Sequence, residues 1–305
     1  MARQRTRPLI VAAVGGNALL RRGEDPDLAH QVANVRGAAA SLAELAVAAD
    51  LVVTHGNGPQ VGLLAARVAL DGHESRLDVL DAETQGQIGY LLTIALSNAI
   101  VDRPVVTLLT QVEVDPLDPA FHAPTKPIGI GTDELTAKDL AAHQGWVVGP
   151  DGDRWRRLVS SPEPQRVIEL ESVDLLVRAG TIVVCAGGGG IPVSRDADGT
   201  LNGVEAVVDK DLTAALLATR LGADQLLLLT DVDAIYDGWG SDDASRIARI
   251  DTASLRGKRL PAGSMGPKAE AACRFAETGG FAAIGSLADA ATISLGQAGT
   301  IVTAR

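Results

Sequence analysis

The sequence predicts an α/β fold, a three-layer αβα sandwich with a central, mostly parallel sheet and a small protruding α+β insertion. Short apolar runs rich in Val, Ile and Leu are typical of parallel strands buried on both faces. They alternate with longer alanine-rich segments that suit helices, and this spacing indicates βαβ units. With 305 residues, the chain is long enough for one large α/β domain or for two packed lobes.

The first part of the chain begins with an apolar strand at 9–14, which ends at the pair Gly15-Gly16. Asp25 and Pro26 predict the cap and first-turn proline of a long alanine-rich helix that ends near Ala49. The elements expected next are a strand at 51–54, a glycine corner at 56–58, a helix that begins at Pro59, a long helix at 77–99 and a strand at 105–109.

The alternation breaks between about 115 and 163, where four prolines cluster. A short helix at 134–142 is expected there, followed by a hairpin whose strands, 146–149 and 154–159, flank a turn. We expect this segment to form a small insertion that stands off the sheet and serves as a mobile flap over the site.

After Ser172 the alternation resumes, with further glycine turns at the ends of the elements. The expected elements are a strand at 181–185, a four-glycine turn at 187–190, a helix at 211–221, a strand at 225–230, a glycine-then-proline helix start at 263–268 and last strands at 281–285 and 300–303.

The net charge of −11 argues against a surface for nucleic acid. Two cysteines are too few for a disulfide framework. No apolar run approaches the ~18 residues of a membrane span. Arg3, Arg5 and Arg7 before the first apolar run resemble a signal peptide, but that run leads into a glycine loop that the rest of the chain needs. We therefore expect a cytoplasmic protein that binds neither nucleic acid nor membrane.

The stretch 203–212 places Lys210 between two carboxylates, Asp209 and Asp211, at the start of an apolar helix. A cluster of ions at a helix start, close to glycine turns, is what phosphoryl transfer needs, because that chemistry depends on positioning and charge neutralisation. The alternative interpretation is an N-capped helix with a solvated Asp-Lys-Asp start.

Two sequence patterns bear on nucleotide binding. The chain contains no G-x-x-x-x-G-K-[ST] sequence, which excludes a Walker-type site. The spacing of Gly56, Gly58 and Gly62 resembles a dinucleotide fingerprint and is the one feature in favour of a nicotinamide-dependent oxidoreductase. Glycine turns recur after several strands, however, and together they suit a long polyphosphate held at one sheet edge.

The chain resembles the carbamate kinases of the amino acid kinase superfamily over essentially its whole length. The matching stretches are 14–19, 54–62, 85–90, 124–129, 186–193, 203–211, 229–236 and 263–268. The resemblance implies phosphoryl transfer between ATP and carbamate, giving carbamoyl phosphate and ADP. Other superfamily members carry a lysine where this chain has Ala13 and a small residue where it has Lys210, which disfavours an acetylglutamate or uridylate kinase.

The resemblance also implies roles for charged residues. Lys210 is expected to neutralise the transferring phosphoryl group, and Asp211 to orient Lys210 and Lys268. Lys268 approaches from the nucleotide side, and Lys126 is the cation of the flap. Without the resemblance, a lysine in a proline-rich loop such as Lys126 is more often a solvated charge, and Lys268 could equally be a surface residue of a first helical turn. His55 is expected to have a structural or hydrogen-bonding role, because carbamate is already anionic and needs no general base.

The remaining expected contacts also follow from the resemblance. Phosphoryl and substrate binding is assigned to Gly15, Gly16, Asn17, Gly56, Asn57, Gly58, Gly188 and Gly189, with carbamate at the turn 56–58. Nucleotide binding is assigned to Asp209, Thr230, Asp231, Val232, Ala234, Tyr236, Met265 and Gly266. Mg²⁺ is expected to arrive with the ATP or ADP phosphates, and no carboxylate cluster for a resident metal is expected.

On the same basis, residues 1–202 form an N-terminal lobe with the carbamate and phosphoryl site, and 203–305 form a nucleotide-binding lobe. A homodimer is expected, formed through the apolar helix near 88–100. Arginine metabolism is the associated pathway, with purine or another nitrogen source as the alternative. The competing functions are another phosphotransferase of the superfamily, a catalytically silent nucleotide-binding regulator and the oxidoreductase.

Overall fold

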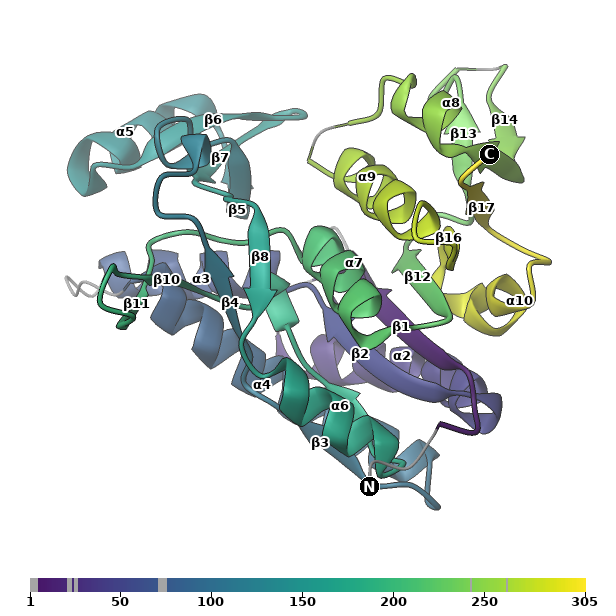
Figure 1. Ribbon diagram of the computed structural model, residues 1–305. Coiled ribbons are helices and arrows are strands. Elements are labelled where there is room, and N and C mark those ends of the chain that lie inside the picture. Colours follow the sequence, from purple (N-terminus) through teal and green to yellow (C-terminus); the bar gives the residue numbers. More distant parts are fainter. Residues whose placement is uncertain (1–4, 21–23, 25–26, 71–75, 242, 262) are drawn as a thin grey trace.

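The computed structural model describes residues 5–20, 24, 27–70, 76–241, 243–261 and 263–305. Its centre is an eight-stranded sheet (Figure 1). In spatial order the strands are β15 (Arg249–Asp251), β17 (Thr300–Thr303), β16 (Phe281–Ser286), β12 (Gln225–Thr230), β1 (Leu9–Val14), β2 (Asp50–His55), β9 (Ile182–Val184) and β3 (Val105–Thr107). All neighbouring pairs are parallel except β16 with β17, so the predicted mostly parallel sheet is confirmed.

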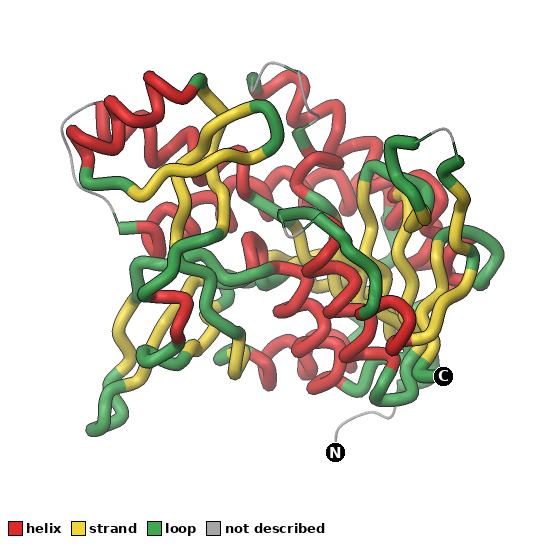
Figure 2. The backbone as a smooth tube through the Cα atoms, turned by 90° about the horizontal axis from the view of Figure 1, so that it is seen from above, coloured by secondary structure: helices red, strands yellow, loops and turns green. Residues whose placement is uncertain are grey.

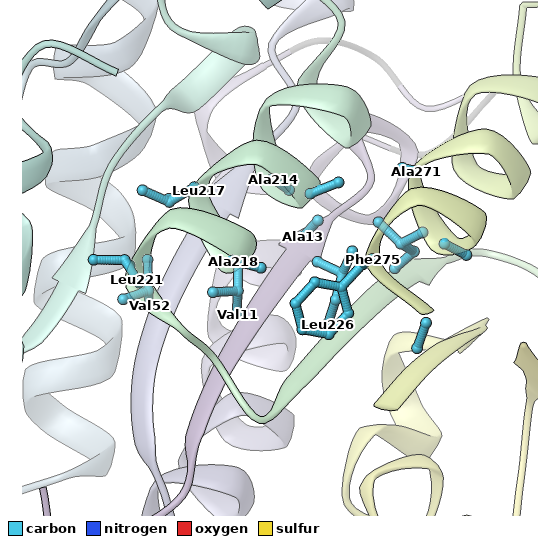
Figure 3. Packing of buried hydrophobic residues seen from close by; sticks show 14 of the residues in the cluster. Val11, Ala13, Val52, Ala214, Leu217, Ala218, Leu221, Leu226, Ala271 and Phe275 are labelled. Atoms are coloured by element: carbon cyan, nitrogen blue, oxygen red, sulfur yellow. The ribbon is translucent and has the colours of Figure 1, made fainter. Parts of the chain in front are cut away.

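Helices cover both faces of this sheet, because both sets of alternating strand residues are apolar. In β1, Ile10 and Ala12 pack with α2 (Leu28–Ala48), α4 (Leu77–Ala99) and α10 (Ala290–Ser294). Val11 and Ala13 pack on the other face with α6 (Leu170–Arg178), α7 (Lys210–Leu221), α8 (Thr252–Arg256) and α9 (Met265–Ala276). Figure 3 shows the second face, where Phe275 of α9 lies beside Leu226 of the sheet. The three-layer αβα sandwich is therefore confirmed.

The insertion is a separate body that projects from the sheet (Figures 1 and 2). It contains α5 (Glu134–Gln144) and an antiparallel sheet of β5 (Lys126–Thr132), β7 (Arg154–Val159) and β6 (Val147–Asp151). The predicted helix and hairpin are confirmed. Sequence patterns did not reveal β5, which packs against α3 (Gly58–Leu70).

A second, four-stranded sheet was not predicted. Its strands are β11 (Leu201–Gly203), β10 (Ile191–Arg195), β4 (Gln111–Val114) and β8 (Pro164–Val167). Each has only three to five residues, too few for a clear alternation of apolar and polar positions. The remaining short elements are α1 (Gly16–Leu19), β13 (Ile235–Asp237), β14 (Ser245–Ile247) and the 3₁₀ turns at 119–121, 187–189 and 287–289.

Two boundaries need correction. The cap of α2 is Asp27, whose carboxylate accepts from the His30 N–H at 2.8 Å, whereas the predicted cap, Asp25 with Pro26, lies outside the described residues. The third strand ends at Thr107, two residues earlier than predicted. The lobe division at 202/203 stays a prediction, and strands from both segments share the central sheet. Among the helices in the described ranges, none is long and apolar enough to cross a membrane.

Candidate active site

Glycine turns meet at the carboxyl edge of the central sheet, because β12, β1, β2 and β9 are parallel neighbours that end there together. The Gly15 N–H donates to Leu229 O at 2.8 Å, and the Gly56 N–H donates to Val14 O at 2.9 Å. A Cβ atom on Gly56 would lie only 2.7 Å from the backbone nitrogen of Gly16. These turns therefore touch, and a side chain at position 56 would separate them.

The start of α7 lies in the same place. The Asp209 carboxylate caps the helix, accepting from the N–H groups of Asp211 at 2.9 Å and Leu212 at 3.2 Å. The Thr213 hydroxyl donates to Gly189 O at 2.8 Å, which ties α7 to the four-glycine turn. Lys210 and Asp211 consequently occupy a first helical turn that packs against glycine backbone.

Three lysines from three separate segments converge on two aspartates. Lys210 Nζ lies 2.6 Å from Oδ1 of Asp211, and Lys268 Nζ lies 2.9 Å from Oδ2 of the same carboxylate. Lys126, at the start of β5 in the insertion, lies 2.7 Å from Oδ2 of Asp209. The structure thus brings together all four residues expected to be catalytic, with Asp209 as a further partner.

Burial and charge oppose each other in this cluster. Burial lowers the pKa of Lys210 to about 8, although Asp211 opposes the shift. Burial acts to lower the pKa of Lys268 as well, but the charges of Asp211 and Asp209 raise it overall. Burial would raise the pKa values of both aspartates, yet the neighbouring lysines hold them below their ordinary range. At neutral pH the Lys268 ammonium and the carboxylates of Asp209 and Asp211 are therefore charged, and so is most of Lys210.

Glycine backbone packs around the turn 56–58, which is predicted to bind the substrate. Asn57 is 2% exposed, and a Cβ atom on Gly188 would overlap its side-chain amide. A Cβ on Gly189 would lie 3.1 Å from the nitrogen of Lys210. Gly58 begins α3 with open space at its Cβ position. Asn17 lies in α1, and its side chain is outside the described part of the chain.

The residues predicted to bind nucleotide lie on the β12 side of the cluster. Thr230 ends β12 beside Gly15, whose Cβ position is 3.6 Å from the Thr230 Cα atom, and its hydroxyl bonds Asp231 at 3.0 Å. Met265 begins α9, the helix that carries Lys268. Val232 is half-buried and Ala234 is buried in the stretch that follows β12, and Gly266 follows Met265 in α9.

Tyr236 makes contacts within its own hairpin. Its hydroxyl donates to the Asp233 carboxylate at 3.1 Å, and its ring packs edge-on against Trp239 with centroids 5.4 Å apart.

His55 is buried, and burial lowers the pKa of its imidazole to about 4. The ring is neutral at pH 7, which fits the expected hydrogen-bonding role: Nδ1 lies 3.2 Å from Gly56 O. Within the described ranges, no group of three or more His, Cys, Asp or Glu side chains could cage a metal ion. The carboxylates of Asp209 and Asp211 are paired with lysines.

Sequence patterns missed a polar group on α4. Asp81, Thr84 and Gln85 are fully buried on the helix face that also carries Leu80 and Ile88. Gln85 donates to the carbonyl oxygens of Gly187 at 2.9 Å and Thr110 at 3.1 Å, so it braces the four-glycine turn. Polar residues at i, i+3 and i+4 within an apolar helical stripe were the available signal.

The fold and the site together define an α/β protein in which glycine turns and three lysines gather at one sheet edge, an arrangement suited to an anionic substrate. A sequence model described as the amino acid kinase family matches residues 8–284. Carbamate kinases from Rhizobium meliloti and Haemophilus influenzae are 47% and 48% identical, each over 96% of this chain and over 93% and 96% of their own lengths.

A solved structure gives the same result. Carbamate kinase from Giardia lamblia bound to AMP-PNP is 36% identical, with a TM-score of 0.87 over 98% of this chain and 99% of that one. The chain belongs to the amino acid kinase family and, within it, to the carbamate kinases.

Proposed function

We propose that the chain catalyses reversible phosphoryl transfer between ATP and carbamate, giving carbamoyl phosphate and ADP. The observation that carries this proposal is the convergence of Lys126, Lys210 and Lys268 on Asp209 and Asp211 at the glycine-lined sheet edge. Near full-length similarity to carbamate kinases supports the choice of carbamate.

In this mechanism a carbamate oxygen attacks the γ-phosphorus of ATP, the bond to the β,γ-bridging oxygen breaks, and ADP leaves with the electron pair. Negative charge spreads over the equatorial phosphoryl oxygens in the transition state. Lys210 and Lys268 neutralise that charge while Asp211 holds both ammonium groups in place. Backbone N–H groups of the glycine turns add fixed donors, apart from those that already donate to backbone oxygens, such as the N–H groups of Gly15, Gly56 and Gly189. Carbamate needs no proton removed before it attacks.

The nucleotide is assigned to the segment from Thr230 to Tyr236 with Met265 and Gly266. The AMP-PNP in the Giardia lamblia relative supports ATP as the phosphoryl donor. Mg²⁺ is proposed to enter as part of the nucleotide substrate, where it neutralises phosphate charge. Within this segment the carboxylate of Asp231 accepts a hydrogen bond from the Thr230 hydroxyl.

We further propose a homodimer that forms through α4. Tyr90 is 63% exposed and Ile94 is 45% exposed on this helix, and they lie four residues apart on one face. Ile94→Arg is expected to yield monomers in light scattering. If Ile94→Arg still has the molecular mass of the wild-type protein, the dimer interface does not lie at Ile94. The cytoplasmic location stays a prediction from the sequence.

The test of the activity is a coupled assay of ATP formation from ADP and carbamoyl phosphate, with acetyl phosphate as the alternative donor. We expect turnover with a clear preference for carbamoyl phosphate. Absence of ATP formation from carbamoyl phosphate, in folded protein with Mg²⁺ present, would refute the proposal.

A further inference from the structure

Asp81 and Thr84, in the first turns of α4, are fully buried and bind the same side-chain amide. The Nδ2 group of Asn57 donates to Oδ1 of Asp81 and to Oγ1 of Thr84, both at 2.8 Å. An amide NH₂ group has two hydrogens, so these two acceptors use both of them.

Thr84 determines which way round the Asn57 amide lies. Its Oγ1 atom is 3.0 Å from the backbone oxygens of both Leu80 and Asp81, so the hydroxyl hydrogen is donated within the helix. Only lone pairs of Oγ1 then face Asn57. A flipped amide would set its carbonyl oxygen against that oxygen, whatever the protonation state of Asp81. The Asn57 Oδ1 atom therefore lies on the amide edge that faces away from α4.

The other side of the amide is held by the glycine turns. A Cβ atom on Gly188 would lie 2.6 Å from Cγ of Asn57, so glycine backbone packs directly on the amide. Gly56, the preceding residue of the turn, would place a Cβ 3.3 Å from Cδ of Lys210. Asn57 is thus a fixed amide next to the lysine cluster.

The carboxyl group of Asp81 retains an unsatisfied atom. Its Oδ2 is buried and has no hydrogen-bond partner among the described residues. A buried oxygen of this kind lowers the stability of a fold. A buried aspartate that served only to fill space at position 81 would therefore lower the stability of the fold without benefit. A role in orienting Asn57 explains why an aspartate lies there.

We propose that Asp81 and Thr84 are positioning residues, which hold the Asn57 amide so that its carbonyl oxygen faces the anion that accepts the phosphoryl group. This oxygen then accepts a hydrogen bond from the amino group of that anion, which is a carboxylate bearing an amino group. A carboxylate that bears a methyl group, such as acetate, has no donor for this oxygen and leaves it buried and unpaired. Sites built to bind an N–H reject analogues that lack it. The inference rests on the proposed function, because the reacting anion is the one assigned there.

The experiment measures kcat/KM for ATP formation with carbamoyl phosphate and with acetyl phosphate. The two test variants are Asp81→Asn and Thr84→Val, which keep the side-chain volumes. Thr84→Val removes the oxygen that opposes the flipped Asn57 amide, so we expect the preference for carbamoyl phosphate to fall about tenfold, the value of one hydrogen bond. In Asp81→Asn the Thr84 oxygen still opposes the flip, so the preference should fall less than in Thr84→Val. The loss should appear mainly in the KM for carbamoyl phosphate, since the amino group is present in both the ground state and the transition state.

Thr93→Val is the matched control. Thr93 lies on the same helix, and its hydroxyl bonds Thr107 at 2.7 Å instead of Asn57, so the preference should be that of the wild type. Melting temperatures of all three variants separate a change of preference from loss of fold, and Thr84→Val alone suffices if Asp81→Asn is unstable.

The outcomes are distinct. Normal carbamoyl phosphate turnover with an unchanged preference in Thr84→Val overturns this inference and leaves the proposed function standing. A preference that falls equally in Thr93→Val also overturns it, because the effect would then belong to the whole helix. A wild-type protein that ignores carbamoyl phosphate overturns the proposed function and this inference together.

Discussion

The Lys268 ammonium donates to Oδ2 of Asp211 at 2.9 Å, although 57 residues separate the two along the chain. The bond joins the first turn of α9 to the first turn of α7. The other oxygen of Asp211 accepts from Lys210, so one buried carboxylate fixes two cations from two helices. Each lysine therefore depends on α7 and α9 packing in their observed register.

Lys210→Ala is expected to lower kcat for ATP formation from carbamoyl phosphate and ADP by about 10²–10³, the usual effect of removing an electrostatic group. Circular dichroism should show a folded protein. Lys138→Ala is the control, since Lys138 is an exposed lysine of the insertion whose partner is Glu134. Near-normal turnover in Lys210→Ala would remove this side chain from the mechanism.

The rate should fall at alkaline pH, because the pKa of Lys210 is about 8. A lysine is charged below its pKa, so kcat/KM should be constant toward neutrality and decline as the pH rises through about 8. Arginine stays charged to far higher pH, so Lys210→Arg should be slower yet lack this decline. The comparison is a pH profile of both proteins between about pH 6 and 10. A decline that persists unchanged in Lys210→Arg would assign the titration to another group.

Asp211→Asn is expected to destabilise the protein by about 3 kcal/mol, because it leaves two buried ammonium groups without their shared carboxylate. It should also move the alkaline decline to lower pH, since Asp211 is the main group that opposes the effect of burial on the pKa of Lys210. Chemical denaturation and the same pH profile measure the two effects. Asp139→Asn, at an exposed position of α5, is the control. An equally stable Asp211→Asn protein would mean that the cluster is solvated.

The parts of this site that are close together in sequence could be predicted, whereas contacts between segments far apart in sequence could not. Asp209, Lys210 and Asp211 are consecutive, so a helix start with charges is legible in the sequence itself. The pairing of Lys126 with Asp209 joins residues 83 positions apart and depends on how the insertion folds back, which no local pattern encodes. The resemblance to a family, rather than periodicity, suggested that Lys126 belongs to the site.

The same contrast explains what was missed in the fold. The long helix predicted at about 77–99 is confirmed as α4, because a segment of helix-favouring residues 23 positions long is easy to recognise. β4, with four residues, pairs with β10 and β8, which lie more than forty residues further along the chain. β11 pairs with the nearby β10, but its three residues are too few to show a strand pattern. The position of Asp81 and Thr84 within an apolar helical stripe is a signal in the sequence, but the partner that they bind, Asn57, emerges only from the packing of α4.

Gly62→Ala tests whether the insertion must sit close to α3 for catalysis. A Cβ atom at position 62 would overlap the N and Cα atoms of Gly129 in β5, so the strand must move away from the helix. Lys126 begins the same strand and should then leave Asp209. We expect kcat/KM to fall about a hundredfold, the usual effect of displacing an aligned group by about 1 Å.

The control for this prediction is Gly37→Ala in α2, where a Cβ would meet nothing within 4 Å. It should keep full activity and gain about 0.5–1 kcal/mol of stability from the better helix former. A double-mutant cycle of Gly62→Ala with Lys126→Ala then separates the causes. If the glycine acts by placing Lys126, the double variant should be hardly slower than Lys126→Ala alone. Additive losses would instead show that the contact between Gly62 and Gly129 supports activity by a route that does not involve Lys126.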